Sequence, residues 1–426
     1  MLLKTAFLVY YTNVNKYSFN ALIGALESGN VHNDIEIFFI KSKEEIIKNL
    51  AFFIKKYEEV ILGISFFTTQ LWEIFDLIKT IRKRYNDQVL CIAGGPHPSG
   101  DFKGTLKMGF DIVFIGESEG SIIEFLTKFI NGNDYRKIKG IAYLDENGEY
   151  CYTGKRIPID LDKYAPFPIK HNKFGAIEIT RGCPYICYFC QTPFILGIHP
   201  RHRSIESICK YVRLMKSVNL TDIRFISPNA FSYGSEDGKT VNLEKIEELL
   251  YKIKEIIKPE GRIFFGSFPS EVRPEHVYEE SLDLIVKYAS NDNIIIGAQS
   301  GSQRVLNLCH REHTIEDVYK AVETTLSKKL KANVDFIFGL PGETKEDIKL
   351  TIEMMKTLAN KGARIHTHTF IPLPQTPFAQ KEVGKITKDL EKAIYELTSK
   401  GSAFGEWKQQ EKLALKIEKY LKTGEL

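Results

Sequence analysis

Three cysteines lie in one eight-residue window, at positions Cys183, Cys187 and Cys190. Thiolates are the usual ligands of iron–sulfur clusters, and a 4Fe-4S cube normally takes four of them. Because this window supplies three, one iron of such a cluster would keep an open coordination position. The spacing therefore predicts a cluster that binds a small molecule at its fourth iron, and chemistry would start at that iron.

The spacing of the cysteines, three residues and then two, with Phe189 directly before the last one, resembles the radical S-adenosylmethionine (SAM) superfamily. In that family the open iron chelates the amine and carboxylate of SAM, and reduction of the cluster cleaves SAM to a 5′-deoxyadenosyl radical. The resemblance implies a 4Fe-4S cluster and SAM as cofactors. It also implies an electron donor of the flavodoxin or ferredoxin type as a partner.

A structural zinc site is the alternative interpretation of clustered cysteines. Zinc takes four ligands, usually as two separated pairs, and the chain has no second Cys-x2-Cys. A histidine would have to complete such a site, and three lie near enough in sequence to be considered: His171, His199 and His202.

A disulfide framework is disfavoured by the cysteine content. Seven cysteines in 426 residues are an odd and sparse set, and the N-terminus has no basic stretch followed by an apolar segment. We therefore expect a reducing, cytoplasmic location. The remaining cysteines are expected to be isolated core or surface residues: Cys91, Cys151, Cys209 and Cys309.

Composition and charge indicate an ordinary globular protein. The hydrophobic content of 43% and the charged content of 26% are typical of such domains. No uninterrupted apolar stretch approaches the ~18 residues that a membrane-spanning helix needs. The net charge of +4 is small for this length, and lysines and glutamates are interspersed. Neither a membrane nor a nucleic-acid partner is indicated.

Residues 1–135 alternate between short apolar runs and segments with helical periodicity, which predicts a parallel, doubly wound α/β domain of the Rossmann or flavodoxin type. In such a sheet the ligand lies beyond the carboxyl ends of the strands. The expected strands are Thr5–Tyr10, Ile35–Ile40, Val60–Ser65, Val89–Ala93 and Ile112–Ile115.

The carboxyl ends of the last three of these strands carry glycine and polar residues. A Ser-x-apolar triplet that starts at Ser65, followed 26 residues later by Gly94-Gly95, resembles the second half of the cobalamin-binding signature of methionine synthase and mutase domains. The resemblance implies a third cofactor, cobalamin, whose nucleotide tail these residues line. The implied contacts are Ser65, Phe66, Thr68, Gly94, Gly95, Pro96, His97, Gly116, Glu117 and Glu119.

The first half of that signature would fall at residues 18–23, where Asn20 takes the place of the histidine that ligates cobalt. The departure implies base-off cobalamin without a histidine on cobalt, which is similar to many cobalamin-dependent radical enzymes. A flavodoxin-like domain that has lost its cofactor is the alternative, because a doubly wound sheet carries many functions.

A hairpin and a proline-containing linker at 136–170 separate this domain from a second series of strands and helices. That series, at 171–385, predicts a partial (β/α)6 TIM-like radical SAM barrel with its ligands at the carboxyl ends of the strands, and residues 386–426 are predicted to be a small helical region rich in Lys and Glu. The expected barrel strands are Ala176–Thr180, Ile223–Ser227, Arg262–Ser267, Asn293–Gln299, Val334–Phe338 and Ile365–Phe370.

The resemblance to the radical SAM family extends to polar and glycine residues at the ends of these strands. They are similar to the family's binding positions for SAM: Phe189, Ser227, Ser267, Glu271, Gln299, Ser300, Gly301, Gly339 and Pro341. On the last strand His366 and His368 alternate, so both rings lie on one face. A metal bound there would need a third ligand, which the sequence does not indicate.

The two resemblances together identify a cobalamin-dependent, class B radical SAM enzyme, in which the commonest activity is methylation of an unactivated carbon. The methyl group would pass from SAM to cobalamin, and a second SAM would supply the 5′-deoxyadenosyl radical that activates the substrate. The Lys-, Ile- and Asn-rich composition resembles archaeal members, and a residue of methyl-coenzyme M reductase is one conceivable substrate. A cobalamin-assisted cyclase or rearrangement enzyme, and a non-catalytic iron–sulfur electron carrier, are the alternatives.

Overall fold

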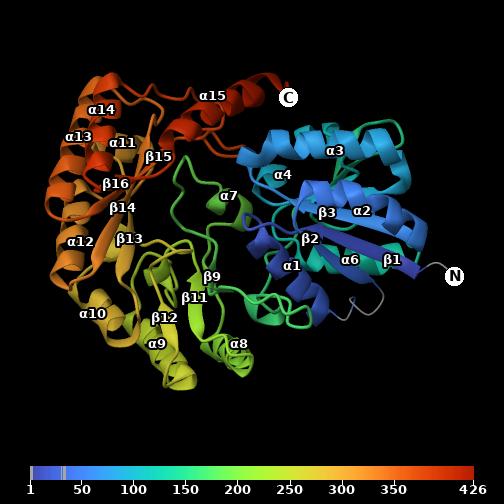
Figure 1. Ribbon diagram of the computed structural model, residues 1–426, viewed down its shortest axis with the longest axis horizontal. Helices are drawn as coiled ribbons and strands as arrows, with labels where there is room; N and C mark the ends of the chain where they lie inside the picture. Colours follow the sequence, from blue (N-terminus) through green and yellow to red (C-terminus); the bar gives the residue numbers. More distant parts are fainter. Residues whose placement is uncertain (1–2, 30, 32–34) are drawn as a thin grey trace. The chain divides into compact units, whose positions relative to one another are not determined.

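The computed structural model describes residues 3–29, 31 and 35–426, and it divides the chain into two folded units, which Figure 1 traces from blue to red. The first unit comprises residues 1–175 and 424–426, and the second comprises residues 176–423. The division falls at the start of the strand that leads to the three cysteines.

Unit 1 is built on a sheet with the strand order β2-β1-β3-β4-β5-β6-β7. Strands β1 to β5 pair in parallel, and β6 and β7 add an antiparallel hairpin to the edge at β5. The strands are β1 (Leu3–Tyr10), β2 (Glu36–Ile40), β3 (Tyr57–Ser65), β4 (Leu90–Gly94), β5 (Ile112–Phe114), β6 (Ile141–Leu144) and β7 (Tyr150–Tyr152). All five predicted parallel strands are present, and the hairpin predicted as a connector continues the same sheet.

Helices cover both faces of this sheet, as expected of a doubly wound domain. Figure 1 shows α3 on one side and α1 and α6 on the other. Apolar residues spaced three or four apart put one face of each helix on the sheet, and Phe19, Ile23 and Phe125 of α1 and α6 share one buried cluster with strand residues. The helices are α1 (Lys16–Ser28), α2 (Lys43–Lys56), α3 (Leu71–Tyr85), α4 (Pro96–Gly100), α5 (Phe102–Lys107) and α6 (Glu119–Ile130).

Unit 2 contains the six predicted barrel strands in two sheets, β12-β11-β8 and β13-β14-β15-β16, all parallel. A single bridge between Val272 and Ile296 joins the region after β12 to β13. The strands are β8 (Ile177–Glu178), β11 (Asp222–Ile226), β12 (Arg262–Phe264), β13 (Asn293–Gln299), β14 (Lys331–Phe338), β15 (Arg364–Thr369) and β16 (Ala403–Phe404). The last of these lies in the region predicted to be helical and adds a seventh strand.

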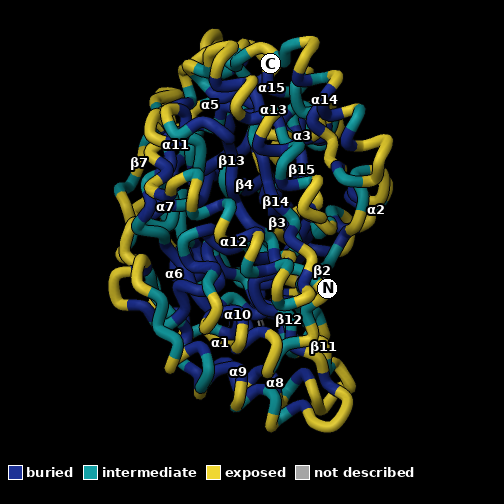
Figure 2. The backbone as a smooth tube through the Cα atoms, turned by 90° about the vertical axis from the view of Figure 1, so that its left-hand side faces the viewer, coloured by how far each residue is buried: buried dark blue, intermediate teal, exposed yellow. Residues whose placement is uncertain are grey.

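The helices of unit 2 are α7 (Thr192–Leu196), α8 (Ile205–Ser217), α9 (Leu243–Ile257), α10 (Glu279–Tyr288), α11 (Gln303–Leu308), α12 (Ile315–Ser327), α13 (Lys345–Asn360), α14 (Lys388–Ser399) and α15 (Trp407–Thr423). In Figure 1, α12, α13 and α14 lie along the outer side of these strands, whereas α7 does not. Figure 2 shows β13 and β14 buried, while exposed residues gather on the helices and loops. No helix in the described part of the chain has the length and apolarity needed to cross a membrane.

The end of unit 1 is held against α1 by a buried carboxylate. Glu27 accepts hydrogen bonds from the backbone N–H groups of Ile169, Lys170 and His171 and lies 2.7 Å from the His171 ring nitrogen Nδ1. Burial raises the pKa of Glu27, but the bonds from His171 and the backbone outweigh burial and bring its pKa below the ordinary value. A Cβ on Gly24 would lie 2.4 Å from the carbonyl oxygen of Ala165, so the chain passes directly over α1.

We expect Glu27→Ala to lower the free energy of unfolding of unit 1 by about 2 kcal/mol, because it leaves three partly buried backbone N–H groups without their charged acceptor. Urea denaturation of the full chain, followed by circular dichroism, measures this change. The matched control is Glu45→Ala, which removes an exposed carboxylate that accepts from Lys41 N–H, and its effect is expected to be within about 0.5 kcal/mol.

The stabilisation by Glu27 depends on pH with a defined sign. Its pKa in the folded chain lies below the ~4.3 of an unfolded glutamate, so the contribution is fully present above that value. It is lost as the pH falls through the folded-state pKa. Equal losses of stability in Glu27→Ala and Glu45→Ala would contradict the assignment.

Candidate functional site

The three cysteines lie on a loop that begins directly after β9 (Thr180–Arg181). The return of the chain holds this loop closed, because β9 pairs with β10 (Arg201–His202) and the N–H of Cys183 donates to the carbonyl oxygen of Gly197, 3.0 Å away. Gly182 has a φ of +88°, and a Cβ there would lie 2.4 Å from the His199 carbonyl oxygen. Only glycine fits such a turn without strain, so the local backbone sets the direction in which the loop leaves the strand.

The cysteine side chains lie where a bare thiolate is unfavourable. Burial raises the pKa of Cys183 to about 12 and also raises the pKa of Cys190. The Arg311 guanidinium points at the sulfur of the remaining cysteine, Cys187, with Nη1 3.6 Å from Sγ. Buried thiolates need positive charge close by, and bound iron supplies it, so this site fits an iron–sulfur cluster.

Arg311 also connects the cysteine loop to the predicted SAM residues. Its Nη2 donates to the carbonyl oxygen of Gly297, 2.9 Å away. A Cβ on Gly297 would lie 2.7 Å from both Arg311 Nη2 and Gln299 Nε2, and 3.6 Å from Glu271 Oε2. The structure therefore brings Cys187, Glu271 and Gln299 together around one buried guanidinium.

Several polar atoms near this point are buried without a hydrogen-bond partner among the described residues: Ser267 Oγ, Gln299 Oε1, Arg311 Nε, His313 Nδ1, and Nη1 and Nη2 of Arg273. Buried polar groups in folded proteins nearly always have partners. The guanidinium of Arg273 lies over the ring of Tyr185, a residue of the cysteine loop, with Cζ 3.4 Å from the ring centroid. Unpaired cationic donors suit a carboxylate, so this polar set fits a ligand such as SAM.

Other predicted SAM residues have structural partners in unit 2. Ser227 Oγ donates to the Asn229 carbonyl oxygen, and Ser300 Oγ lies 3.4 Å from Thr351 Oγ1. A Cβ on Gly301 would lie 2.6 Å from Thr351 Cα. Ser300 and Gly301 pack the loop after β13 against α13, and Ser227 bonds within the loop after β11. The contact of all three with SAM stays a prediction.

The loop after β14 is likewise held from within. A Cβ on Gly339 would lie 2.7 Å from the carbonyl oxygen of Gly384, and Glu343 Oε2 accepts hydrogen bonds from the N–H groups of Gly339 and Leu340. Burial raises the pKa of Glu343 to about 7. Pro341 is partly buried in the same turn. Gly339 permits the backbone of Gly384 to approach closely.

Apolar side chains pack beside the cysteine loop. Tyr188 and Phe189 contact a buried cluster formed by Val305, Cys309, Leu340, Phe370 and Phe378. Tyr188 also stacks on His310 with ring centroids 5.3 Å apart. This cluster limits access of water to one side of the loop, which protects reactive intermediates.

In unit 1, Gly94 and Gly95 follow β4 as predicted, but their surroundings differ. A Cβ on Gly94 would have nothing closer than Phe114, at 3.8 Å. Gly95 has a φ of +97°, and a Cβ there would lie 2.6 Å from Ser65 Oγ. A Cβ at Gly94 would therefore make only an ordinary van der Waals contact, and the tight contact at Gly95 brings Ser65 next to this turn. This edge fits a large cofactor.

The residues on either side of this glycine pair support the loop. His97 is fully buried, lies 3.1 Å from Thr68 Oγ1 through Nδ1, and has its ring 5.3 Å from that of Phe66. Burial lowers the pKa of His97 to about 4, so the ring is neutral at pH 7. Pro96 is the first residue of α4.

The third strand end carries Gly116, Glu117 and Glu119. The N–H of Gly116 donates to Ser99 Oγ, and Glu117 Oε2 accepts from the N–H of Ile159. Glu119 is buried at the start of α6. The polar residues at this edge are therefore tied to neighbouring backbone, and their contact with cobalamin stays a prediction.

Asn20, predicted to replace the cobalt-ligating histidine, lies within α1 and is buried. Its Oδ1 accepts a hydrogen bond from the Tyr11 hydroxyl, 2.8 Å away. The loop after β1 instead carries Asn15, whose Nδ2 donates to the carbonyl oxygens of Tyr10 and Ser65. Asn15 links the ends of β1 and β3, a role that its sequence position alone did not reveal.

Both parts of the chain match models of known families. Residues 177–355 match the radical SAM superfamily, and residues 4–126 match the B12 binding domain. The chain belongs to the cobalamin-dependent radical SAM enzymes. The cofactors of this radical SAM enzyme are a 4Fe-4S cluster, SAM and cobalamin, which the two family matches imply. This confirms the predicted fold class and cofactors.

Curated relatives of this radical SAM enzyme share part of their length with it. Uncharacterized protein MJ1620 of Methanocaldococcus jannaschii is 29% identical over 71% of this chain, and uncharacterized methyltransferase PH0819 of Pyrococcus horikoshii is 26% identical over 68%. A tRNA-2-methylthio-N(6)-dimethylallyladenosine synthase of Finegoldia magna is 31% identical over 48%. The chain covers 66%, 62% and 43% of these proteins, less than two thirds of each.

Two solved structures have a similar fold. The methyltransferase TsrM of Kitasatospora setae, with cobalamin and a 4Fe-4S cluster bound, has a TM-score of 0.69 at 16% identity, over 89% of this chain and 77% of TsrM. The cobalamin-dependent enzyme OxsB has a TM-score of 0.63 at 19% identity, over 83% of this chain and 52% of OxsB. At these identities the likeness establishes the fold.

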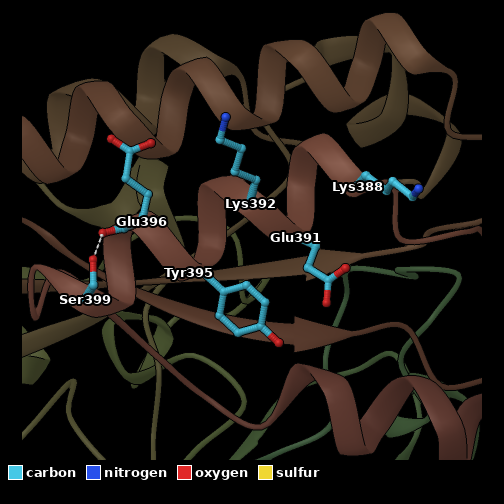
Figure 3. Close-up of a pocket in the computed structure, with 6 residues that line it drawn as sticks. All are labelled: Lys388, Glu391, Lys392, Tyr395, Glu396 and Ser399. Carbon is cyan, nitrogen blue, oxygen red and sulfur yellow. Dashed lines mark hydrogen bonds between the residues drawn. The ribbon is translucent and has the colours of Figure 1, made fainter.

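A shallow depression on α14 shares no residue with the two sites described above. Figure 3 shows its six lining residues, all on the one helix: Lys388, Glu391, Lys392, Tyr395, Glu396 and Ser399. None of the predicted cluster or cofactor residues lines it. The alternation of lysine and glutamate is typical of a solvated helix face.

Sequence reasoning missed two buried arginines of unit 2, Arg273 and Arg311. No spacing rule distinguishes a buried arginine from an exposed one. The signal that could have drawn attention to Arg311 is its place shortly after the Gln-Ser-Gly-Ser run at Gln299.

We expect replacement of Cys183, Cys187 or Cys190 by alanine to remove the iron of the anaerobically reconstituted protein and to abolish reductive cleavage of SAM, because three thiolates are the protein's share of the ligands. Iron and sulfide analysis, with chromatography of 5′-deoxyadenosine, measures both. The control is Cys209→Ala, a buried cysteine of α8, which should keep about four irons per chain. Full iron in the triple alanine variant would refute the assignment.

We expect Gly94→Trp to prevent retention of hydroxocobalamin, because the indole would occupy the strand end where the cobalamin tail is predicted to lie. The matched control is Gly94→Ala, whose Cβ meets nothing closer than 3.8 Å and which should bind as the wild type does. The measurement is the absorption spectrum after gel filtration, where the wild type should show bound, base-off cobalamin. Equal retention by Gly94→Trp would move the site elsewhere.

Proposed function

We propose that this enzyme methylates an unactivated carbon of its substrate. The observation that carries the proposal is the presence of a B12 binding domain and a radical SAM domain in one chain. When bound, cobalamin and SAM supply a transferable methyl group and a carbon-centred radical. A relative described as an uncharacterized methyltransferase, and the fold shared with the methyltransferase TsrM, favour methyl transfer over rearrangement.

The chain's own residues would position the cofactor and protect it. The guanidiniums of Arg273 and Arg311 provide unpaired buried donors for a carboxylate, and Glu271 supplies a nearby oxygen for an ammonium group. Burial raises the pKa of Glu271, and the positive charge of Arg311 opposes that rise. The apolar residues beside Tyr188 and Phe189 keep water from the loop.

Methylthiolation is the activity of a relative named above, but the first domain differs from what that chemistry would need. A second iron–sulfur cluster would need a further set of cysteine ligands in this domain. Residues 1–175 contain two, Cys91 and Cys151. Cys91 is buried in β4, where burial raises its pKa to about 12, so it is a core residue.

We expect turnover with methyl-labelled SAM, cobalamin and a reductant to place label on carbon in one acceptor from a whole-cell extract of the source organism. Each turnover uses one SAM as methyl donor and one as radical source. S-adenosylhomocysteine and 5′-deoxyadenosine should therefore form in comparable amounts. Scintillation counting and mass spectrometry of the labelled acceptor measure the outcome.

Two variants separate the parts of this reaction. Gly94→Trp should still form 5′-deoxyadenosine but transfer no label to the acceptor, whereas Cys187→Ala should do neither. Substrate conversion with 5′-deoxyadenosine but without label would indicate a cyclase or rearrangement enzyme. Absence of both products would indicate an electron carrier, and label on nitrogen or sulfur would exclude carbon methylation.

A further inference from the structure

Two neighbouring strands of unit 2 bring an aspartate and two histidines onto one face. Asp335 of β14 and His366 of β15 are paired in the parallel register. His368 follows two residues after His366, so its ring projects from the same face of the strand. The sequence indicated the histidine pair, and the tertiary structure adds the third side chain that a metal site needs.

The ligand atoms of these three residues converge. His366 Nδ1 lies 2.9 Å from Asp335 Oδ1 and 3.1 Å from His368 Nε2, and one ligand atom from each residue lies within 4.8 Å of the others. Ligands bound at ~2.0–2.1 Å from one ion are separated by about 3.0 Å in an octahedral site and about 3.3 Å in a tetrahedral one. The separations of 2.9 and 3.1 Å are compatible with atoms that share an ion, and they are also within the range of hydrogen bonds.

Hydrogen bonding alone satisfies this group poorly. An imidazole nitrogen carries either one hydrogen or one lone pair. His366 Nδ1 therefore cannot donate to Asp335 and also accept from His368 Nε2, although both atoms are within hydrogen-bond distance. A cation between the three atoms removes the conflict, because each atom then contributes a lone pair.

The surroundings hold the three side chains in place and leave a path to them. Phe404 of β16 stacks on the His366 ring, with centroids 4.4 Å apart and planes 9° apart. The Asp335 side chain is 12% exposed and that of His366 is 31% exposed. Asn333, two residues before Asp335 on the same face, has a buried Oδ1 that finds no hydrogen-bond partner in the described part of the chain.

We propose that Asp335, His366 and His368 bind a divalent first-row transition-metal ion, distinct from the iron–sulfur cluster. Two imidazoles and a carboxylate are a ligand set for zinc or ferrous iron. Three protein ligands leave at least one coordination position for water or a substrate oxygen. The thiolates of the cysteine loop differ from this set in both ligand element and bond length.

We expect the cluster-reconstituted wild type, dialysed against zinc, to hold about one zinc ion per chain. Mass spectrometry of the metals counts zinc separately from the iron of the cluster and the cobalt of cobalamin. Zinc-edge X-ray absorption should show nitrogen and oxygen neighbours at ~2.0–2.1 Å and no sulfur at ~2.3 Å. The assay involves no turnover, so its outcome is independent of whether the enzyme methylates carbon.

His368→Gln and Asp335→Asn, which nearly preserve side-chain volume, should each reduce the bound zinc to background while the iron content and far-ultraviolet circular dichroism stay unchanged. The matched control is His171→Gln, which alters a histidine paired with a single carboxylate, Glu27, and should retain the zinc. Sulfur neighbours, zinc retained in both site variants, or no zinc in the wild type would overturn the proposal.

Discussion

The cost of burying ionisable side chains governs both halves of this molecule. Thiols, guanidiniums and carboxylates are placed at or near the ends of parallel strands, where backbone and apolar side chains exclude water. A buried ionised group is stable only with a partner of opposite charge or with hydrogen bonds. Cys187 faces Arg311, Glu27 receives backbone N–H groups, and Arg273 pairs with Glu275 through Nε. Nη1 and Nη2 of Arg273 find no partner among the described residues.

The distinction between satisfied and unsatisfied polar groups separates scaffold from ligand site. Glu343 and Ser227 sit in sequence motifs like those of radical SAM relatives, and their hydrogen bonds hold the loops on which they lie. Gln299 and Ser267 carry buried oxygens that lack protein partners in the described chain. The same strand ends therefore contain residues that shape the loops and residues that are left to meet a ligand.

Glycine serves two purposes that sequence cannot tell apart. Gly301 and Gly339 permit close approach of other backbone, since a Cβ at either would collide with it. Gly94 differs, because a Cβ there would meet nothing closer than 3.8 Å. A motif read as a ligand cradle can thus be a packing contact, and the neighbouring atoms decide which it is.

The sequence by itself determined the cluster cysteines, the order of strands and helices, and both cofactor domains. These follow from local spacing, because three cysteines in a short loop and alternating apolar runs have few structural meanings. It did not show that the connecting hairpin joins the first sheet, or reveal the short strand β16 near the C-terminus, because both depend on pairing with distant strands.

Only the tertiary structure decided which distant side chains meet. Arg311 lies 124 residues from the cysteine that it faces, and Asp335 lies 31 residues from the histidine paired with it across two strands. Strand register and burial create these contacts, and neither is encoded in the spacing of a single segment. The chemistry of the cysteine loop could therefore be predicted from the sequence. The charged residues around the loop, and the aspartate beside the two histidines, could be identified only in the folded structure.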